Sequence, residues 1–409
     1  MKLIISIFLF ITFPSLMICD PPKPRTSRNF LKEVTKLNKS TRKGLKVNNA
    51  LKLSKDGFLG DGGTGFVYEG LDLEENVTVA IKFIADDKIK QAQNEFKILT
   101  ILEADKVANK IEKKNTIVER YGIPAVHYYG LWEGYTVTAI TKCDEDLIDI
   151  SNNHKLNNPL DILILFRNFV IQSKYMHSRG VRHDDIKPEN IMTSGHKSYI
   201  IDFNRSSKMS NDSGACTVSY AARVAHFKQP RVAKSDWESF LYAMCYVLRV
   251  PLAWFHPQIK NLSQREKEIC CGTFKSQTGK IRDTINGSFP NGPVKDVFNE
   301  FADQVFSDDS VKFPNYNHME EFISKKIAKL HAINSSLPPM FSWLNEKEIQ
   351  KAIADFKSTN PLDIKEISEP STINFKKFSY PNERKPATGE GQGPGTDSIL
   401  RKKSDWSDY

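Results

Sequence analysis

The chain has 409 residues, of which 40% are hydrophobic and 26% are charged, and its formal net charge is +9. This composition is typical of a soluble globular protein with one large domain or two smaller ones. Because the basic excess is modest, we expect a solvated surface and no nucleic-acid partner, while acidic partners and anionic substrates stay open.

The N-terminal segment Met1–Asp20 differs from the rest of the chain. Lys2 is followed by Leu3–Met17, which is almost wholly apolar. An apolar core of about 15 residues suits a secretory signal peptide and is short for a membrane span. We therefore expect residues 1–19 to be a cleaved signal peptide and the mature protein to be secreted, or to stay in the lumen of the secretory pathway, without a stable membrane span. An uncleaved anchor is the alternative.

Asparagine sequons give secretion a second, weaker support, because chance alone predicts about three in a chain rich in Asn and Ser. The sites are Asn38, Asn76, Asn204, Asn211, Asn261, Asn286 and Asn334.

The cysteines predict neither a disulfide framework nor a zinc site. Cys19 would leave with the signal peptide, and no C-x-x-C pair occurs. The others are Cys143, Cys216, Cys245, Cys270 and Cys271. One disulfide is compatible with an oxidising compartment, but a core of this size does not require it.

Residues 20–50 are polar, basic and rich in Pro, Ser and Thr. We expect them to form a basic flexible leader, with a short helix at Asn29–Leu37.

A glycine motif, G-x-G-x-x-G, follows at Gly60, Gly62 and Gly65, with Val67 two residues later. In a dinucleotide-binding fold this motif opens a helix. Here aromatic and β-branched residues follow it, so the motif joins two strands. A hairpin of this kind lets backbone amides approach the phosphates of ATP.

The apolar run Val77–Ile84 predicts a buried strand that contains V-A-I-K, including Ala80 and Lys82. A lysine inside such a strand is costly unless it is paired. We expect Lys82 to hold the α- and β-phosphates of ATP; an edge lysine that points to solvent is the alternative. Helical periodicity follows, and it places Glu95 where it can pair with Lys82. Glu103 is the other candidate partner, but it falls too late in the helix.

Two more strands are predicted, at Ala125–Leu131 and Tyr135–Thr141. Ile140 would lie at the back of the nucleotide pocket. Thr141–Cys143 would be the hinge whose backbone binds adenine, so Thr141 and Cys143 join the predicted ATP-binding residues.

A long apolar helix, Asp161–His177, leads to the stretch V-R-H-D-D-I-K-P-E-N at Val181–Asn190. Its acid, cation and amide have the spacing of a phosphotransferase catalytic loop. In that arrangement Asp185 orients the acceptor hydroxyl, Lys187 neutralises the moving phosphoryl group and Asn190 holds a metal ion.

A short hairpin at Met192–Asp202 then leads to Asp202-Phe203-Asn204. An acid directly after a buried strand, with an aromatic residue behind it, fits a ligand of Mg²⁺ or Mn²⁺. We therefore expect Asp202 and Asn190 to share the metal.

Together these motifs resemble a eukaryotic protein kinase, and more closely the casein kinase I family. Three further stretches carry the closer resemblance. Gly122-Ile123-Pro124 precedes a strand, and Phe306–Phe322 is similar to the family's last helices. The segment Thr217–Ser239 is similar to its activation segment, which lacks Ala-Pro-Glu and ends in Asp-x-Glu-Ser at Asp236–Ser239.

The resemblance implies an α+β, bilobal fold over residues 51–335, with a small β-rich N-lobe and a larger helical C-lobe. It implies ATP with Mg²⁺ or Mn²⁺, and phosphoryl transfer to Ser or Thr hydroxyls of protein substrates. It also implies that Thr217 braces Asp185 and Lys187. Residues 336–409 are expected to form short helices and a disordered tail.

Three positions depart from the family's pattern. Asp184 stands where most kinases have an Arg that pairs with an activation-loop phosphate, so we do not expect that switch here. Asn204 replaces a Gly, and because Asn tolerates left-handed backbone, Asp202 is expected to reach the metal. Ser219 replaces an Arg that helps bind acidic or phosphorylated substrates, which leaves the substrate preference open. These departures motivate an alternative function, a secreted pseudokinase that binds nucleotide or protein.

Overall fold

The computed structural model of the protein describes most of the chain between residues 27 and 331. The described residues are 27–40, 44–62, 64–84, 86–103, 121–133, 135–153, 155–210, 216–307 and 311–331, together with 341, 342, 344 and 347. The predicted signal peptide, nearly all of the predicted C-terminal tail and the sequons at Asn211 and Asn334 lie outside them.

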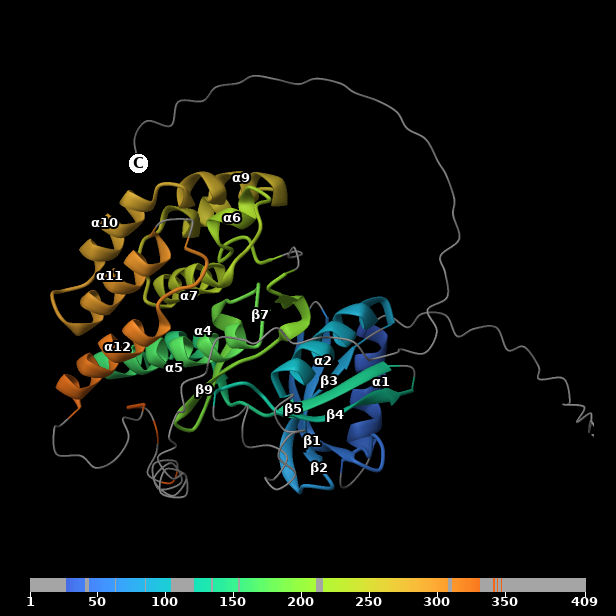
Figure 1. Ribbon diagram of the computed structural model, residues 1–409. Helices are drawn as coiled ribbons and strands as arrows, with labels where there is room; N and C mark the ends of the chain where they lie inside the picture. Colours follow the sequence, from blue (N-terminus) through green and yellow to red (C-terminus); the bar gives the residue numbers. More distant parts are fainter. Residues whose placement is uncertain are drawn as a thin grey trace, which may run out of the picture. The chain divides into compact units, whose positions relative to one another are not determined.

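The first lobe is built on a five-stranded antiparallel sheet with the strand order β1-β2-β3-β5-β4 (Figure 1). The strands are β1 Leu51–Gly62, β2 Gly65–Asp72, β3 Val77–Ile84, β4 Val126–Trp132 and β5 Tyr135–Thr141. Side chains alternate between the two faces of a strand, so Phe66 and Tyr68 of β2 are buried with Ile81 and Phe83 of β3. The rings of Phe66 and Phe83 stack with centroids 5.1 Å apart, which seals the sheet's own core.

The helix α1 (Ser27–Ser40) packs on this sheet. It contains the helix expected at Asn29–Leu37, but its packing corrects the expectation that this part of the leader is flexible. Val34 is buried in the sheet's apolar cluster, and Thr35 Oγ1 lies 2.6 Å from the Tyr68 hydroxyl. The Asn38 amide donates hydrogen bonds to the carbonyls of Ser54 (2.8 Å) and Lys55 (2.9 Å). An isolated helix of this length is marginal in water, so these tertiary contacts stabilise α1. The basic composition of the segment gives no indication of them.

The helix α2 (Ile89–Glu103) follows a 3₁₀ turn, η1 (Asp86–Lys88), and joins the sheet to the second lobe. Ile98, Leu99 and Leu102 belong to the large apolar cluster of the helical lobe. Phe96 stacks on Tyr129 of β4, with ring centroids 4.0 Å apart. One helix therefore packs against both lobes, and its position depends on both.

The second lobe is mostly helical (Figure 1). Its helices are α4 Leu147–Asn152, α5 Pro159–Ser178, α6 Arg223–His226, α7 Ala233–Val247, α8 Pro257–Lys260, α9 Gln264–Lys275, α10 Thr278–Ser288, α11 Pro293–Val305 and α12 Tyr316–Leu330. Its short strands and 3₁₀ turns are β6 Glu145–Asp146, β7 Val181–Arg182, η3 Pro188–Asn190, β8 Ile191–Ser194, β9 Lys197–Ile200, η4 Phe203–Arg205, β10 Ser207–Lys208 and η5 Ala253–Phe255.

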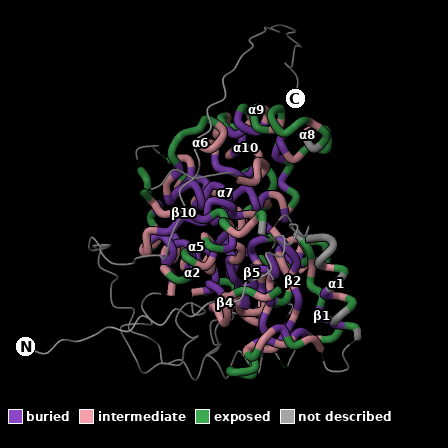
Figure 2. The backbone as a smooth tube through the Cα atoms, turned by 90° about the vertical axis from the view of Figure 1, so that its right-hand side faces the viewer, coloured by how far each residue is buried: buried purple, intermediate pink, exposed green. Residues whose placement is uncertain are grey.

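Aromatic residues of α5, α7 and α11 form the centre of this lobe. Phe169 stacks on Phe240 with ring centroids 3.9 Å apart, and Trp237 stacks on Phe301 at 4.5 Å. Figure 2 shows α5 and α7 as largely buried, whereas α8 is exposed. The predicted α+β fold, with a small β-rich lobe and a larger helical lobe, is confirmed.

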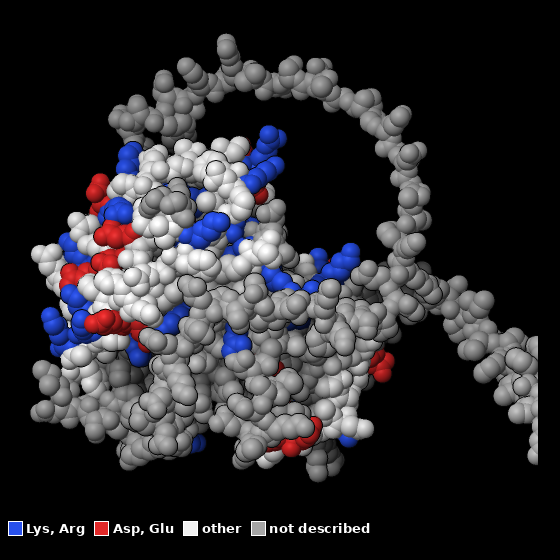
Figure 3. Space-filling view, in the orientation of Figure 1, with Lys and Arg blue, Asp and Glu red and all other residues white. Residues whose placement is uncertain are grey.

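On the described part of the helical lobe, basic and acidic side chains lie next to one another (Figure 3). Lys326 pairs with Asp296, and Lys174 lies 3.7 Å from Glu320. Exposed pairs of this kind contribute little to stability, so the charge here keeps the surface hydrated. Among the described helices, none combines the length and apolar character that crossing a bilayer requires.

Candidate active site

Four predicted nucleotide-binding residues share one face of the sheet. Val67, Ala80, Lys82 and Ile140 are half-buried, whereas the alternate residues of β2 and β3 are buried in the sheet's own core. Val67 pairs with Lys82, and Ala80 pairs with Ile140. The strand register therefore brings the valine of the glycine motif beside the lysine, and the alanine beside the residue expected at the back of the pocket.

The glycine motif lies at the β1–β2 connection, where Gly60 pairs with Val67 and Gly62 with Gly65. Gly65 has φ +156°, and a Cβ there would lie 2.0 Å from the Phe83 carbonyl oxygen. Packing therefore admits only glycine at this position. A Cβ at Gly60 would meet nothing within 4 Å, so the space beside Gly60 is open and packing does not require glycine there.

Lys82 forms ion pairs with two acids from different parts of the chain. Its Nζ lies 3.1 Å from Glu95 Oε2 on α2 and 3.0 Å from Asp202 Oδ1, which follows β9. Burial alone would lower the pKa of Lys82, but the attraction and hydrogen bonds of the two carboxylates outweigh burial and raise it. Lys82 is therefore a fixed cation. Glu95, not Glu103, is its partner on α2; Glu103 accepts a hydrogen bond from the Val126 amide.

The predicted hinge is anchored at both ends. The Thr141 amide donates to the Ala125 carbonyl (3.0 Å), and Thr141 Oγ1 accepts from the Ala125 amide (2.9 Å). At the other end, the Asp144 amide donates to the Thr193 carbonyl (2.8 Å), and Cys143 between them is buried. The amide of Thr141 is thus used within the protein.

The catalytic-loop residues come together around Asp185, whose side chain is 4% exposed. Thr217 holds Asp185 Oδ1 with its hydroxyl (2.7 Å) and its amide (2.9 Å). Asn190 donates through Nδ2 to the Asp185 carbonyl (2.9 Å). Lys187 is half-buried, and its charge contributes to lowering the pKa of Asp202. The predicted contact of Thr217 with Asp185 is present.

Asp236, a buried acid on α7, holds the catalytic loop in place. Asp236 Oδ2 accepts hydrogen bonds from the His183 amide (2.8 Å) and from His177 Nε2 (2.9 Å). Its Oδ1 accepts from the Asp184 amide (2.9 Å). Burial would raise the pKa of Asp236, but the hydrogen bond and charge of His177 outweigh burial and lower it. Asp236 is therefore an ionised anchor for the loop that carries the catalytic acid.

In a comparison with known protein families, residues 53–282 match the protein kinase domain. The match includes Lys82, Glu95, Asp185, Asn190 and Asp202. The chain belongs to the protein kinase family. Kinases of this family bind ATP with Mg²⁺ and act on proteins.

The kinase departs from the common pattern at Asp184, which is buried beside two arginines. Arg182 Nε lies 3.2 Å from Asp184 Oδ1, and an Arg231 nitrogen lies 3.7 Å from the same oxygen. Ser207 donates to Asp184 Oδ2 and accepts from Arg182 (2.8 Å). The carboxylate of Asp184 thus links the catalytic loop to Arg231, and this contact involves no phosphate. This arrangement fits the expectation that an activation-loop phosphate is not needed.

The second departure works differently from our prediction. Asp202, not Asn204, is the left-handed residue, with φ 64° and ψ 64°. Asn204 lies in the turn η4 without a positive φ. Asp, like Asn, tolerates this conformation, and the ion pair with Lys82 holds it. The Asn94 amide on α2 donates to the carbonyls of Asn204 (3.1 Å) and Ser206 (2.8 Å), which fixes the turn.

The residues present fit ATP with Mg²⁺ or Mn²⁺. Asp202 offers a carboxylate, and its pKa is lowered because Lys82 outweighs the effect of burial. Asn190 uses Nδ2 within the loop, which leaves Oδ1 as a ligand. Asn204 Oδ1 is buried and has no hydrogen-bond partner among the described residues. Oxygen donors of this kind suit small hard cations.

Sequence reasoning missed several groups around this site. Arg205 lies 3.6 Å from Asp185 Oδ2 and is partly exposed, so it places a positive charge next to the catalytic acid. Asn94, Arg182 and Arg231 also escaped notice. Arg205 follows Asn204 directly and is therefore close in sequence to Asp202, the predicted metal ligand. This proximity was the one signal in the sequence that could have identified Arg205. Ser219, the third departure, accepts a hydrogen bond at its carbonyl from Trp254 (3.0 Å).

Proposed function

We propose that the protein is an active Ser/Thr kinase of casein kinase I type that works in the secretory pathway or outside the cell. One observation carries the proposal. Lys82 bridges Glu95 and Asp202 at 3.1 and 3.0 Å while Thr217 holds Asp185 at 2.7 Å. The groups that bind the nucleotide and the group that orients the acceptor are therefore in position together, which is the arrangement that phosphoryl transfer requires.

In the proposed reaction, ATP supplies the γ-phosphoryl group and Mg²⁺ neutralises the phosphate charge. The acceptor hydroxyl donates a hydrogen bond to Asp185 and attacks the γ-phosphorus. A bond forms between the acceptor oxygen and phosphorus, the bond to the bridging oxygen of ADP breaks, and the proton passes to Asp185. Lys187 stabilises the transferring group, and Lys82 keeps the α- and β-phosphates in place.

The casein kinase I assignment rests on the resemblance of particular segments. Thr217–Ser239 runs from the brace on Asp185 into α7 without Ala-Pro-Glu. Lys187, two residues after the acid, is the Ser/Thr form of the catalytic loop. The Asp-x-Glu-Ser stretch also stabilises the structure of this chain. Asp236 anchors the catalytic loop through the His183 amide, and Glu238 Oε1 accepts a hydrogen bond from the Arg223 amide (2.8 Å).

Secretion is supported by the apolar segment Leu3–Met17 and by the placement of some sequons. Asn76, Asn261 and Asn286 are exposed, so a glycan attached there would meet solvent. Asn38 and Asn204 are buried, so glycosylation there would conflict with the fold. Sequencing the N-terminus of protein from a secreting cell tests the leader. A start after the apolar segment supports cleavage, and a start at Met1 contradicts it.

A pseudokinase is the second candidate, because Asp184 and Asn204 depart from the family's pattern. The decisive experiment measures phosphate transfer from ATP to casein, and to the protein itself, by wild type and Asp185→Ala. Asp303→Ala, at an exposed ion pair of the helical lobe, is the matched control. We expect Asp185→Ala to lose activity by about 100-fold or more while the control keeps it.

Nucleotide binding, measured in the same proteins, separates the two functions. Wild type that transfers no more phosphate than Asp185→Ala, yet binds ATP, would be a nucleotide-binding pseudokinase. Wild type that neither transfers phosphate nor binds ATP would contradict the nucleotide site as well.

A further inference from the structure

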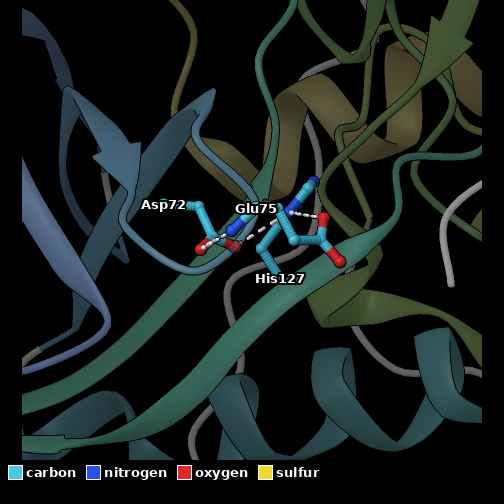
Figure 4. A group of neighbouring side chains, drawn as sticks. All are labelled: Asp72, Glu75 and His127. Atoms are coloured by element: carbon cyan, nitrogen blue, oxygen red, sulfur yellow. Dashed lines mark hydrogen bonds and ion pairs between the residues drawn. The ribbon is translucent and has the colours of Figure 1, made fainter.

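Three side chains with metal-binding atoms meet at the end of the β-rich lobe, and none of them serves the active site. They are Asp72 at the end of β2, Glu75 in the β2–β3 turn and His127 in β4. Figure 4 shows the three side chains turned toward one another. In the sheet, β3 and β5 lie between β2 and β4, so the cluster joins strands that share no hydrogen bonds.

The distances match the geometry of a four-coordinate metal ion. His127 Nδ1 lies 3.2 Å from Asp72 Oδ2 and 3.3 Å from Glu75 Oε2. All three ligand atoms lie within 4.8 Å of one another. A tetrahedral zinc ion with bonds of 2.0–2.1 Å keeps its ligand atoms about 3.3 Å apart. Both nitrogen–oxygen distances thus agree with an edge of that tetrahedron, and the two carboxylate oxygens lie within 4.8 Å of each other.

The ligands are held in place before any ion arrives. Asp72 Oδ1 accepts hydrogen bonds from the amides of Glu74 (2.9 Å) and Glu75 (3.1 Å), which turns Oδ2 toward the histidine. His127 lies at the bulge of β4 between Val126 and Tyr128, where the strand register shifts. Bulges re-aim side chains, and here the bulge directs the imidazole at the two carboxylates.

Two of the three ligands are buried, and the third keeps the cluster open to solvent. The side chains of His127 and Asp72 are 4% and 7% exposed, whereas Glu75 is 31% exposed and leaves one side open to water. Both carboxylates lie close to the same imidazole nitrogen. A divalent ion between the three groups would be bound by all of them, and water would complete the coordination.

We propose that Asp72, Glu75 and His127 bind one divalent ion of the zinc class. One nitrogen and two carboxylate oxygens suit zinc, because an imidazole ligand disfavours Mg²⁺ and Ca²⁺. The ion fastens the β2–β3 turn to β4 at the end of the sheet from which Thr141 leads into the hinge. Its binding stabilises the β-rich lobe, as any ligand of the folded state does.

The test is a titration of the full chain with Co²⁺, and separately with Zn²⁺, after treatment with a chelator and in the absence of nucleotide. Co²⁺ reports its own ligands: nitrogen and oxygen donors give visible d–d absorption, while cysteine adds a near-ultraviolet charge-transfer band. Zn²⁺ is followed by the rise of the melting temperature. The variants are His127→Gln and Glu75→Gln, and Glu75 is exposed enough for its replacement to leave folding intact.

His318→Gln is the matched control, because His318 pairs with Glu300 at 2.8 Å on the surface of the helical lobe. Asp202→Asn identifies any Co²⁺ held by the ATP site. We expect wild type, His318→Gln and Asp202→Asn to bind one Co²⁺ without the cysteine band, and affinity to fall about tenfold or more in His127→Gln and Glu75→Gln.

Four outcomes would overturn the proposal. Wild type could bind no stoichiometric metal, or the two site variants could bind it as tightly as wild type does. Binding that shows the cysteine band, or that is lost in Asp202→Asn alone, would place the ion elsewhere.

Discussion

Replacement of Asp184 by Asn should destabilise the folded kinase, because two buried guanidinium groups contact this carboxylate. Removing one partner of a buried ion pair costs about 3–5 kcal/mol. Burial and Asp236 raise the pKa of Asp184 and so outweigh the attraction of Arg182 and Arg231, which means that ionisation of this carboxyl does not itself stabilise the fold. The cost of the replacement then comes from the hydrogen bonds that Arg182 and Ser207 donate to the carboxylate, and we expect a loss of about 2 kcal/mol in the free energy of unfolding.

The assay is urea unfolding of wild type, Asp184→Asn, Arg182→Met and the double variant, with phosphate transfer measured alongside. Asp87→Asn, at an exposed pair with Lys88, is the control and should change stability little. The double-mutant cycle should give a coupling energy of about 1–3 kcal/mol. Treatment of wild type with a phosphatase should leave its rate unchanged, because Asp184 replaces the arginine that would pair with an activation-loop phosphate, and its carboxylate would repel one.

Two results would refute this reasoning. If Asp184→Asn lay within about 1 kcal/mol of wild type and showed no coupling to Arg182, the buried pair would not hold the loop. If phosphatase treatment abolished transfer, a phosphate would be required in spite of Asp184.

Thr217→Val keeps the side-chain shape but removes the hydroxyl that donates to Asp185 at 2.7 Å, so kcat should fall about tenfold with the KM for ATP unchanged. Steady-state kinetics check this, and an unchanged kcat would show that the amide of Thr217 suffices. Burial lowers the pKa of Lys275 to about 8, whereas an unfolded lysine titrates near 10.4, so above pH 8 the unfolded chain binds more protons and stability rises with pH. The unfolding free energy of wild type relative to Lys275→Met should therefore rise by about 1 kcal/mol per pH unit from pH 8 to 10. A difference that stays constant over this range would contradict the lowered pKa of Lys275.

The sheet was predictable from the sequence because its signals are local. The predicted bounds Val77–Ile84 and Tyr135–Thr141 agree with β3 and β5 to the residue. β-Branched and aromatic runs between turn residues suffice for such strands. The pairing of Lys82 with Glu95 also follows from local reasoning, because a buried lysine needs an acid and the next helix supplies one.

The parts that escaped prediction depend on contacts between distant residues. A short helix was expected at Asn29–Leu37, but its packing was not, and only the contacts of α1 with β1 and β2 show it. Arg231 lies 47 residues after Asp184, and no spacing rule connects them. The left-handed backbone was expected at Asn204, but it occurs at Asp202. Both residue types tolerate this conformation, so propensity does not choose between them, and the ion pair with Lys82 favours Asp202.

The contacts at Asp202 also explain why one helix decides whether the site is assembled. A non-glycine residue in left-handed backbone costs about 1–3 kcal/mol and persists only where its surroundings hold it. Here the holding contacts come from Lys82, which α2 fixes through Glu95, and from Asn94, which α2 places on the carbonyls after Asp202. A displacement of α2 would break both at once, so the metal-binding acid would lose its support and Lys82 its partner in a single movement. Because α2 packs on both lobes, such a displacement would also disturb the apolar core of the helical lobe, and this coupling keeps the assembled arrangement stable.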